Sequence, residues 1–320
     1  MIFKRPDAIV EMDPQSVLDD LLGSARKPDV FLVDMSQLMI ATISKTFKPT
    51  DQIDLGMVRH LILDTLRANV VKFRKDYQEV VLAFDSAKGG LGYWRRDIAY
   101  YYKKNRKKAR DESGFDWEKI FGYIEQVIAE IRLQMPFKSI RVDRVEADDI
   151  IAVLVKRFSL EGRKTLILSG DGDYAQLHKF NGVKQYAPTK KEFVKCKVDP
   201  YMDLMVKLIK GDKGDCIASI KCRSDYYYTQ LDGERAPAIT QKWIAELTSV
   251  DDPRTLMTEE QKSRFEENKK LVDFDLIPDT IQQQIVEAYQ VAKPAGRATM
   301  YNYFMMSGLN KLMGKLQDFL

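Results

Sequence analysis

Three short apolar segments of this chain each lead directly into an aspartate. The segments span residues 30–33, 80–84 and 165–169, and the acids that follow them are Asp34, Asp85, Asp171 and Asp173. Apolar residues recur at helical spacing between these segments, which predicts amphipathic helices near residues 54–75, 120–136 and 146–158. Strands that alternate with helices imply right-handed βαβ units. The predicted fold is therefore α/β, with a mainly parallel central sheet and flanking helices.

Further acids are expected to join those at the strand ends. In an open parallel sheet, ligands bind beyond the carboxyl ends of the strands. Glu146, Asp148 and Asp149 open a predicted helix of the same unit, and Asp212 and Asp215 lie in a glycine-rich turn. Nine carboxylates packed together would repel one another at low effective dielectric unless cations neutralised them. The sequence thus predicts a metal site.

The composition narrows the choice of metal. The chain has two histidines and three cysteines that are not spaced as pairs, which argues against an ordinary zinc site and against a disulfide framework. Oxygen ligands favour a hard cation, so we expect two Mg²⁺ ions, which Mn²⁺ could replace. Two ions facing a phosphate suit in-line displacement at phosphorus. Phosphodiester hydrolysis is the predicted reaction.

Each acid also has an ordinary explanation. Asp148 or Asp149 alone would most often cap a helix, and Asp-Gly-Asp alone is usually a turn. Acids after three strands and at one helix start together favour the metal site. A haloacid-dehalogenase phosphatase would need a second acid where the chain has Ser36. A non-catalytic DNA-binding protein would be expected to lack some of the acids, and none is missing.

One segment, residues 92–110, is both basic and aromatic. Its eight cations are Arg95, Arg96, Lys103, Lys104, Arg106, Lys107, Lys108 and Arg110, and its five aromatics are Tyr93, Trp94, Tyr100, Tyr101 and Tyr102. Asp97 is its only acid. Cations contact phosphates and aromatic faces stack on unpaired bases, so we interpret this basic aromatic segment as a nucleic-acid contact. The alternative is a solvated basic helix or a disordered arm.

The sequence gives no sign of a membrane or of export. The first 28 residues mix acids, bases and prolines, and no later run reaches the roughly 18 apolar residues of a membrane span. The net charge of +4 favours a nucleic-acid partner only weakly. We expect a soluble protein of a reducing cytoplasm.

Five acidic motifs, in their order along the chain, resemble those of the flap endonuclease and 5′-exonuclease family. They are Phe31-Leu-Val-Asp34, Ala83-Phe-Asp85, Glu146-Ala-Asp148-Asp149, Ser169-Gly-Asp171-Gly-Asp173 and Gly211-Asp212-Lys-Gly-Asp215. Within the family, residues 57–63, 92–97, 99–106 and 158–162 look like the ribonuclease H branch of T-even phages. The resemblance runs from about residue 30 to the C-terminus.

The resemblance implies roles for the acids and for an arch in the basic aromatic segment. Asp34, Asp85, Glu146, Asp148 and Asp171 would surround one metal, and Asp173, Asp212 and Asp215 would serve a second, largely through water. Asp149 would be either a neighbouring metal ligand or an acid that supports the ligands. Lys103 and Arg106 would hold the scissile phosphate, and Tyr102 would stack on a base. The other implied nucleic-acid contacts of this segment are Tyr93, Trp94, Arg95, Arg96, Lys104, Asn105, Lys107 and Lys108.

The turn at residues 211–224 resembles the family's helix-three-turn-helix, which grips duplex backbone. Lys213, Lys221 and Arg223 would contact phosphate there. The usual Gly-hydrophobic-Gly tail is replaced by Lys221-Cys-Arg-Ser224, so the glycines that let backbone approach an ion closely are absent.

The resemblance also implies a domain plan and an activity. An N-terminal extension (1–29) would precede a catalytic domain (30–198, with the arch at 88–115) and a smaller helical, duplex-binding lobe (199–320). The expected protein is a monomeric 5′ to 3′ exonuclease and flap endonuclease that removes RNA primers from RNA-DNA hybrids during phage-type replication in the host cytoplasm. Branched, nicked or hybrid duplexes would be its substrates. The apolar C-terminal end, residues 300–316, either packs on the second lobe or docks a partner such as a single-stranded-DNA-binding protein; a sliding clamp is another expected partner.

Overall fold

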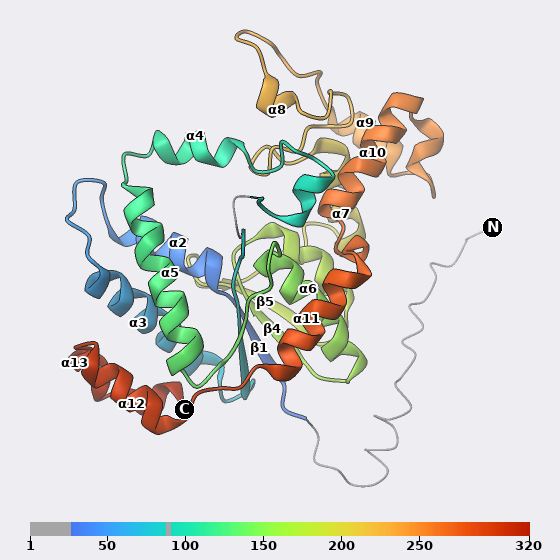
Figure 1. Ribbon diagram of the computed structural model, residues 1–320. Coiled ribbons are helices and arrows are strands. Elements are labelled where there is room, and N and C mark those ends of the chain that lie inside the picture. Colours follow the sequence, from blue (N-terminus) through green and yellow to red (C-terminus); the bar gives the residue numbers. More distant parts are fainter. Residues whose placement is uncertain (1–26, 88–90) are drawn as a thin grey trace, which may run out of the picture.

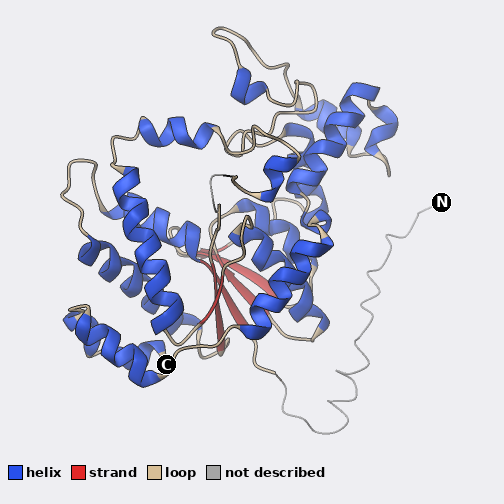
Figure 2. Ribbon diagram, viewed as in Figure 1, coloured by secondary structure: helices blue, strands red, loops and turns tan. Residues whose placement is uncertain are grey.

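A computed structural model describes residues 27–87 and 91–320 of the protein, so the N-terminal extension predicted for residues 1–29 lies almost wholly outside the described residues. At its centre is a six-stranded sheet with the order β3-β2-β1-β4-β5-β6 (Figure 2). The strands are β1 (Val30–Asp34), β2 (Glu79–Ala83), β3 (Lys138–Ile140), β4 (Thr165–Leu168), β5 (Val183–Ala187) and β6 (Glu192–Phe193). β1 to β5 pair in parallel and β6 pairs antiparallel to β5. The mainly parallel sheet is confirmed, whereas β3, β5 and β6 were not identified from the sequence.

The side chains of β1 divide the core into two layers because successive residues of a strand point to opposite faces. Phe31 and Val33 join one apolar cluster, and Val30 and Leu32 join the other. The first cluster lies under α2 (Met35–Thr46), α3 (Leu55–Phe73) and α5 (Trp117–Gln134), and the second under α6 (Ala147–Leu160) and α11 (Asp279–Val291). Figure 1 shows these two sets of helices on opposite sides of the sheet.

The helices predicted between the strands are present, and acids begin them. Asp54 caps α3, and its side chain accepts a hydrogen bond from the Met57 N–H at 2.8 Å. At the start of α6, Glu146 and Asp149 form a reciprocal capping box, which satisfies backbone N–H groups that have no partner inside the helix. α2 follows β1 without a break and was not identified from the sequence.

The chain beyond Lys197 is helical, as expected, but its helices do not all lie together. α7 (Pro200–Lys210), α9 (Gln241–Leu247) and α10 (Glu259–Val272) form an apolar cluster that includes Tyr101 and Tyr102. α11 instead packs on α6, and α12 (Arg297–Met306) packs on α5 at the opposite face of the sheet. The remaining elements are α4 (Asn105–Asp111), α8 (Tyr226–Thr229), α13 (Asn310–Met313) and the 3₁₀ helices η2 (Trp94–Asp97), η3 (Gly172–Lys179), η4 (Pro253–Leu256), η5 (Phe274–Leu276) and η6 (Leu316–Phe319).

The C-terminal end divides between core and surface. Met300 and Phe304 are fully buried in the cluster of α3 and α5. The other side of α12 is open: Tyr301, Met305 and Met306 are 45%, 54% and 89% exposed, and we call these three residues the α12 surface. No helix among the described residues is long and apolar enough to cross a membrane.

Candidate metal centre and nucleic-acid interface

Acids from three strand ends meet at the carboxyl edge of the sheet. Asp34 ends β1 and caps α2, where its Oδ1 accepts a hydrogen bond from the Gln37 N–H at 2.9 Å. Asp85 lies two residues beyond β2, and its Oδ1 accepts from the Ala147 N–H at 2.7 Å. Asp171 caps η3, three residues after β4. Sheet topology therefore brings these side chains to one place, as predicted.

Glu146 and Asp148 reach the same place from the start of α6. We call Asp34, Asp85, Glu146, Asp148 and Asp171 the first acid group; all five line a cleft of about 560 Å³, together with Lys103 and Arg106. The Tyr174 hydroxyl lies 3.1 Å from both Asp34 Oδ2 and Asp148 Oδ1. Because a hydroxyl carries one proton, it can donate to only one of these carboxylates at a time.

The nearby cations do not offset the burial and the negative charge of the first acid group, so some of its carboxyls have raised pKa values. Burial, reinforced by the charges of Asp85 and Asp171, raises the pKa of Asp34 to about 7. Burial also raises the pKa of Asp148 well above its usual value, although Lys103 opposes the shift. A divalent cation would reverse these shifts by favouring the ionised carboxylates. An all-oxygen donor set of this kind fits a hard metal such as Mg²⁺ or Mn²⁺.

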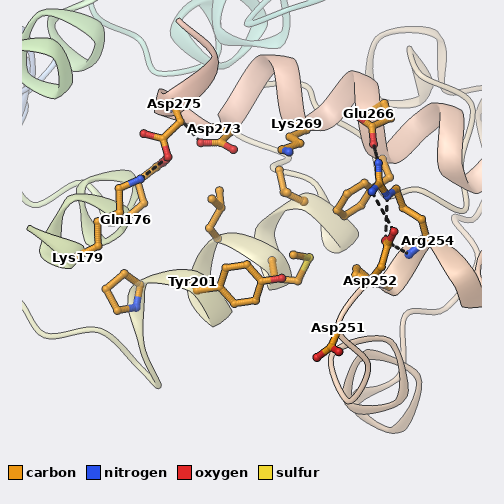
Figure 3. Close-up of a pocket in the computed structure, with 16 residues that line it drawn as sticks. Gln176, Lys179, Tyr201, Asp251, Asp252, Arg254, Glu266, Lys269, Asp273 and Asp275 are labelled. Atoms are coloured by element: carbon orange, nitrogen blue, oxygen red, sulfur yellow. Dashed lines mark hydrogen bonds and ion pairs between the residues drawn. The ribbon is translucent and has the colours of Figure 1, made fainter. Parts of the chain in front are cut away.

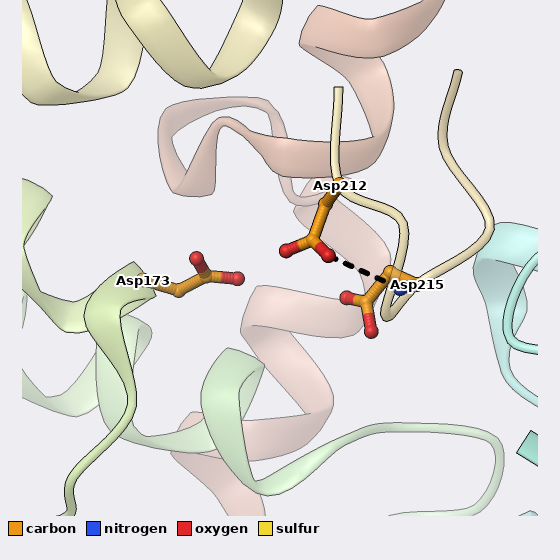
Figure 4. Close-up of side chains that lie close together, drawn as sticks. All are labelled: Asp173, Asp212 and Asp215. Atoms are coloured by element: carbon orange, nitrogen blue, oxygen red, sulfur yellow. Dashed lines mark hydrogen bonds between the residues drawn. The ribbon is translucent and has the colours of Figure 1, made fainter. Parts of the chain in front are cut away.

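A second cluster of acids lies beside the first. Asp173, Asp212 and Asp215, which we call the second acid group, each offer a carboxylate oxygen within 4.8 Å of the others (Figure 4). Lys207, on α7, forms ion pairs with Asp173 and, at 2.8 Å, with Asp212. Burial raises the pKa of Asp173 to about 6 even though Lys207 opposes the shift. The ammonium of Lys207 thus supplies positive charge between acids assigned to a metal, a role that sequence reasoning missed.

Asp149 stands apart from both groups. Its carboxylate is fully buried and accepts hydrogen bonds from Trp94 Nε1 at 2.9 Å and from Arg95 at 2.7 and 3.0 Å. Arg95 also donates to Glu146 Oε2 at 2.8 Å and to the Leu271 carbonyl at 2.8 Å. Asp149 therefore anchors the start of α6 and does not line the cleft.

Lys103 and Arg106 bring cations to the cleft, and we call this pair the arch clamp. Lys103 is 7% exposed, forms an ion pair with Glu146 and lies 3.6 Å from Asp215. Its φ of 55° is in the left-handed region, which costs a non-glycine residue about 1 kcal/mol or more. Arg106 pairs with Asp215 at 2.6 Å. The pKa of Asp215 is lowered, because these cations outweigh the opposing effect of burial.

The structure corrects the interpretation of the basic aromatic segment. Trp94 and Tyr102 were expected to stack on bases and Arg95 to contact nucleic acid, but they are 8%, 2% and 2% exposed. Tyr102 packs in the apolar cluster of α7 and α10, and its hydroxyl donates to Glu146 Oε2 at 3.0 Å. These three side chains therefore hold the segment against the body of the protein. Of the five aromatics, Tyr100 alone is highly exposed, at 51%.

The other predicted contacts of this segment are more accessible. Tyr93 lines the cleft, and its hydroxyl donates to Asp85 Oδ2 at 3.2 Å. Arg96, half-buried, donates to the Tyr102 carbonyl at 3.1 Å. Lys107 and Lys108, on α4, are exposed, and we call them the outer arch lysines. Lys104 and Asn105 are half-buried at the beginning of α4.

The turn after α7 carries the remaining predicted contacts. A Cβ atom at Gly211 (φ 73°) would lie 2.3 Å from the Ile217 carbonyl oxygen, so the turn requires glycine there. Lys213 is exposed. Lys221 lies 3.8 Å from the centroid of the Trp243 ring. Arg223 forms ion pairs with Glu234 and Asp225, so its guanidinium would have to leave these acids to contact phosphate.

A second cavity, of about 380 Å³, lies between η3, α7 and α10 (Figure 3). Several of its charged side chains are paired: Lys179 with Asp275 at 2.5 Å, and Arg254 with Asp252 and Glu266 at 2.9 and 3.0 Å. No member of either acid group lines it. The cavity therefore lies outside the candidate metal centre.

Comparisons with known proteins agree with this architecture. Residues 29–202 match the family described as "5'-3' exonuclease, N-terminal resolvase-like domain", and residues 198–319 match "T4 RNase H, C terminal". Ribonuclease H of Enterobacteria phage T4 is 45% identical over 94% of this chain and 99% of its own length. A 5'-3' exonuclease of Buchnera aphidicola is 30% identical over 34% of each chain.

Solved structures of the phage T5 D15 protein share the fold. The protein co-crystallised with metal ions has a TM-score of 0.56 at 19% identity, covering 82% of this chain and 97% of its own. The D15 flap endonuclease in a pseudo-enzyme-product complex with DNA and metal ions has a TM-score of 0.55 at 18% identity, covering 82% and 99%. By its matched residues and by its likeness to the T4 protein over nearly the full length, the chain belongs to the 5′-3′ exonuclease family, in the group of T4 ribonuclease H.

Proposed function

We propose that the protein is a divalent-metal-dependent phosphodiester hydrolase that degrades nucleic acid from a 5′ end and cuts at flaps and nicks, including RNA primers in RNA-DNA hybrids. The observation that carries the proposal is the cleft in which the first acid group faces Lys103 and Arg106. Acids that bind cations and side chains that bind phosphate are both needed for phosphodiester hydrolysis, and here they line one space.

Different residues in and around the cleft would bind the metal ions, bind the phosphate and hold the metal ligands in place. The first acid group would hold one Mg²⁺ ion and the second acid group another, and such ions activate water and neutralise the charge that develops on phosphate. The arch clamp would exchange its present partners, Glu146 and Asp215, for the scissile phosphate. Lys207 would likewise give up its ion pairs, because metal ions bound by Asp173 and Asp212 would compete with its ammonium for these carboxylates. Arg95 and Asp149 would keep Glu146 in place throughout.

Several further assignments belong to the same proposal. Mg²⁺ is the expected ion and Mn²⁺ a substitute, given the all-oxygen donors. The match to a phage ribonuclease H supports primer removal in the cytoplasm of a host cell. The protein would act as a monomer, with a catalytic domain at residues 30–198 and a duplex-binding region within residues 199–320, of which α11 and α12 pack on the catalytic domain. A single-stranded-DNA-binding protein and a sliding clamp are its proposed protein partners.

Cleavage of defined substrates tests the proposal. A 5′-labelled flap, a nicked duplex and an RNA-DNA hybrid are each incubated with the protein in Mg²⁺, in Mn²⁺ and in EDTA. We expect short 5′ products in either metal and none in EDTA. Tight binding of all substrates without cleavage in either metal would instead favour the alternative, a non-catalytic structure-specific binding protein.

A further inference from the structure

One tyrosine hydroxyl lies between two members of the first acid group that come from different elements. Tyr174 belongs to η3, and its side chain is fully buried. Its hydroxyl oxygen lies 3.1 Å from Oδ2 of Asp34, at the end of β1. It also lies 3.1 Å from Oδ1 of Asp148, in the first turn of α6. A single side chain thus joins two of the elements that build the cleft.

Apolar packing fixes the position of this hydroxyl. The ring of Tyr174 lies in the apolar cluster under α6 and α11, and its centroid is 6.2 Å from that of Phe274. The start of η3 is held as well, because the Asp171 side chain accepts a hydrogen bond from the Asp173 N–H at 3.0 Å. Since protein interiors are closely packed, the ring cannot move its hydroxyl away from the two carboxylates without opening the core.

The two carboxylates differ in their other partners. Asp34 accepts a hydrogen bond from the Gln37 N–H at 2.9 Å, and the Ser169 hydroxyl lies 3.1 Å from its Oδ2. For Asp148, the Tyr174 hydroxyl is the only hydrogen-bond donor among the described residues. If Tyr174 gives its one proton to Asp148, Asp34 still has other donors, whereas the reverse choice leaves Asp148 with none. Asp148 is therefore the carboxylate whose orientation depends on Tyr174.

The same hydroxyl also responds to charge in the cleft. When it donates to Asp148, its oxygen faces Asp34 Oδ2 with no proton between them, and two such oxygens repel each other. A divalent cation on the first acid group would offset this repulsion. A tyrosine that served only the core would need one acceptor for its proton, and this one has two acids of the same group. The position of Tyr174 thus suits a cleft that holds a cation.

We propose that Tyr174 is a positioning residue for the first metal ion: its hydroxyl donates to Asp148 Oδ1 and holds this carboxylate in the orientation that binds the ion. The inference rests on the proposed nuclease function and adds a residue that acts through a metal ligand. Partners that hold metal ligands by hydrogen bonds typically contribute roughly 10- to 100-fold to metal affinity. Without the hydroxyl, the Asp148 side chain would have more rotational freedom, and binding of the ion would have to order it.

Binding of Mn²⁺ to the protein without nucleic acid tests the proposal, with free Mn²⁺ quantified by electron paramagnetic resonance. Tyr174→Phe removes the hydroxyl and keeps the ring. Tyr303→Phe is the matched control, because Tyr303 is also buried and its hydroxyl donates, at 2.7 Å, to Glu130, an acid outside both acid groups. Cleavage of a flap substrate is measured in parallel across a range of Mg²⁺ concentrations.

We expect Tyr174→Phe to weaken the binding of one Mn²⁺ ion about tenfold or more and to leave the other unchanged, because the hydroxyl bonds only to the first acid group. Half-maximal cleavage should need about tenfold more Mg²⁺, whereas kcat at saturating Mg²⁺ and the KM for substrate should change little. Tyr303→Phe should match the wild type. In a protein that already carries Asp148→Ala, adding Tyr174→Phe should cause no further loss of Mn²⁺ affinity.

Wild-type Mn²⁺ affinity in a folded Tyr174→Phe protein, an equal loss for both ions, or a further loss in the double variant would overturn the inference. If Tyr174→Phe does not fold, Tyr174→Met fills the space without a donor, and the same outcomes apply to it. Failure of the wild-type protein to cleave any flap substrate in Mg²⁺ or Mn²⁺ would overturn the proposed nuclease function instead. The Mn²⁺ measurement needs no cleavage, so the two failures are distinguishable.

Discussion

Replacement of Asp34 by asparagine should stabilise the metal-free protein at neutral and alkaline pH. Asp34 is 3% exposed, and burial together with Asp85 and Asp171 raises its pKa from 3.8 to about 7. A carboxyl whose pKa is higher in the folded state stabilises that state fully below its unfolded pKa and loses this contribution as the pH rises through the folded value. The relevant window therefore runs from about pH 4 to about pH 7.

The pKa difference sets the size of the effect. A change from 3.8 to about 7 corresponds to a cost of about 4 kcal/mol above pH 7, at about 1.4 kcal/mol for each tenfold change in proton affinity. Asparagine carries no charge and is as good a helix cap as aspartate. The hydroxyls that donate hydrogen bonds to the Asp34 carboxylate would have to turn to accept hydrogen bonds from the asparagine amide, and this rearrangement offsets part of the gain. We therefore expect a net gain in the free energy of unfolding of about 1 to 4 kcal/mol.

Denaturant unfolding in EDTA at pH 4 and at pH 8 measures this gain. Asp34→Asn should exceed the wild type at pH 8 and match it at pH 4. Asp54→Asn is the control, because Asp54 caps α3 in the same manner but is exposed, so its replacement removes no buried charge. Mg²⁺ should stabilise the wild type more than the variant, because ligands stabilise the state that binds them. An Asp34→Asn protein less stable than the wild type by the same amount at both pH values would refute the reasoning.

The remaining predictions concern the cations and the C-terminal end. Alanine at both residues of the arch clamp should lower kcat by about 100-fold or more, because these cations act where charge develops on the phosphate. Alanine at both outer arch lysines should mainly weaken binding and flatten its salt dependence; equal losses of affinity in both double variants, with kcat unchanged, would contradict the distinction. Polar substitutions on the α12 surface should leave cleavage of short nicked substrates unchanged but remove the stimulation on long templates that we expect from the proposed single-stranded-DNA-binding partner. Loss of folding or of basal cleavage in those variants would show instead that these side chains support the fold, and would contradict the proposed partner site.

The strand-ending acids could be predicted because local sequence and sheet topology both fix their place. Val30 to Val33 is a strand by composition, and Asp34 must then lie at the edge where parallel strands end. β6 has only two residues and β3 only three, so neither leaves a periodic pattern long enough to recognise. Strand pairing, rather than composition, creates these short elements.

The burial of side chains in the basic aromatic segment could not be predicted from the sequence. Trp94, Arg95 and Tyr102 have the composition of an exposed nucleic-acid contact, and their burial depends on Asp149 and on helices more than 90 residues away in the chain. Nothing in the sequence around Lys207 distinguishes it from other lysines of an amphipathic helix. Its role emerges only when α7 packs beside η3 and brings the ammonium between Asp173 and Asp212.

Separate measurements of cleavage and binding in Asp148→Asn test the central claim most directly. Asp148 lines the cleft and belongs to the first acid group, and asparagine removes its charge without changing its shape. The account predicts that this variant binds a 5′ flap substrate with nearly wild-type affinity and loses cleavage in Mg²⁺ by orders of magnitude. Near-normal turnover in Asp148→Asn would contradict the assignment of the first acid group as the metal centre of a nuclease.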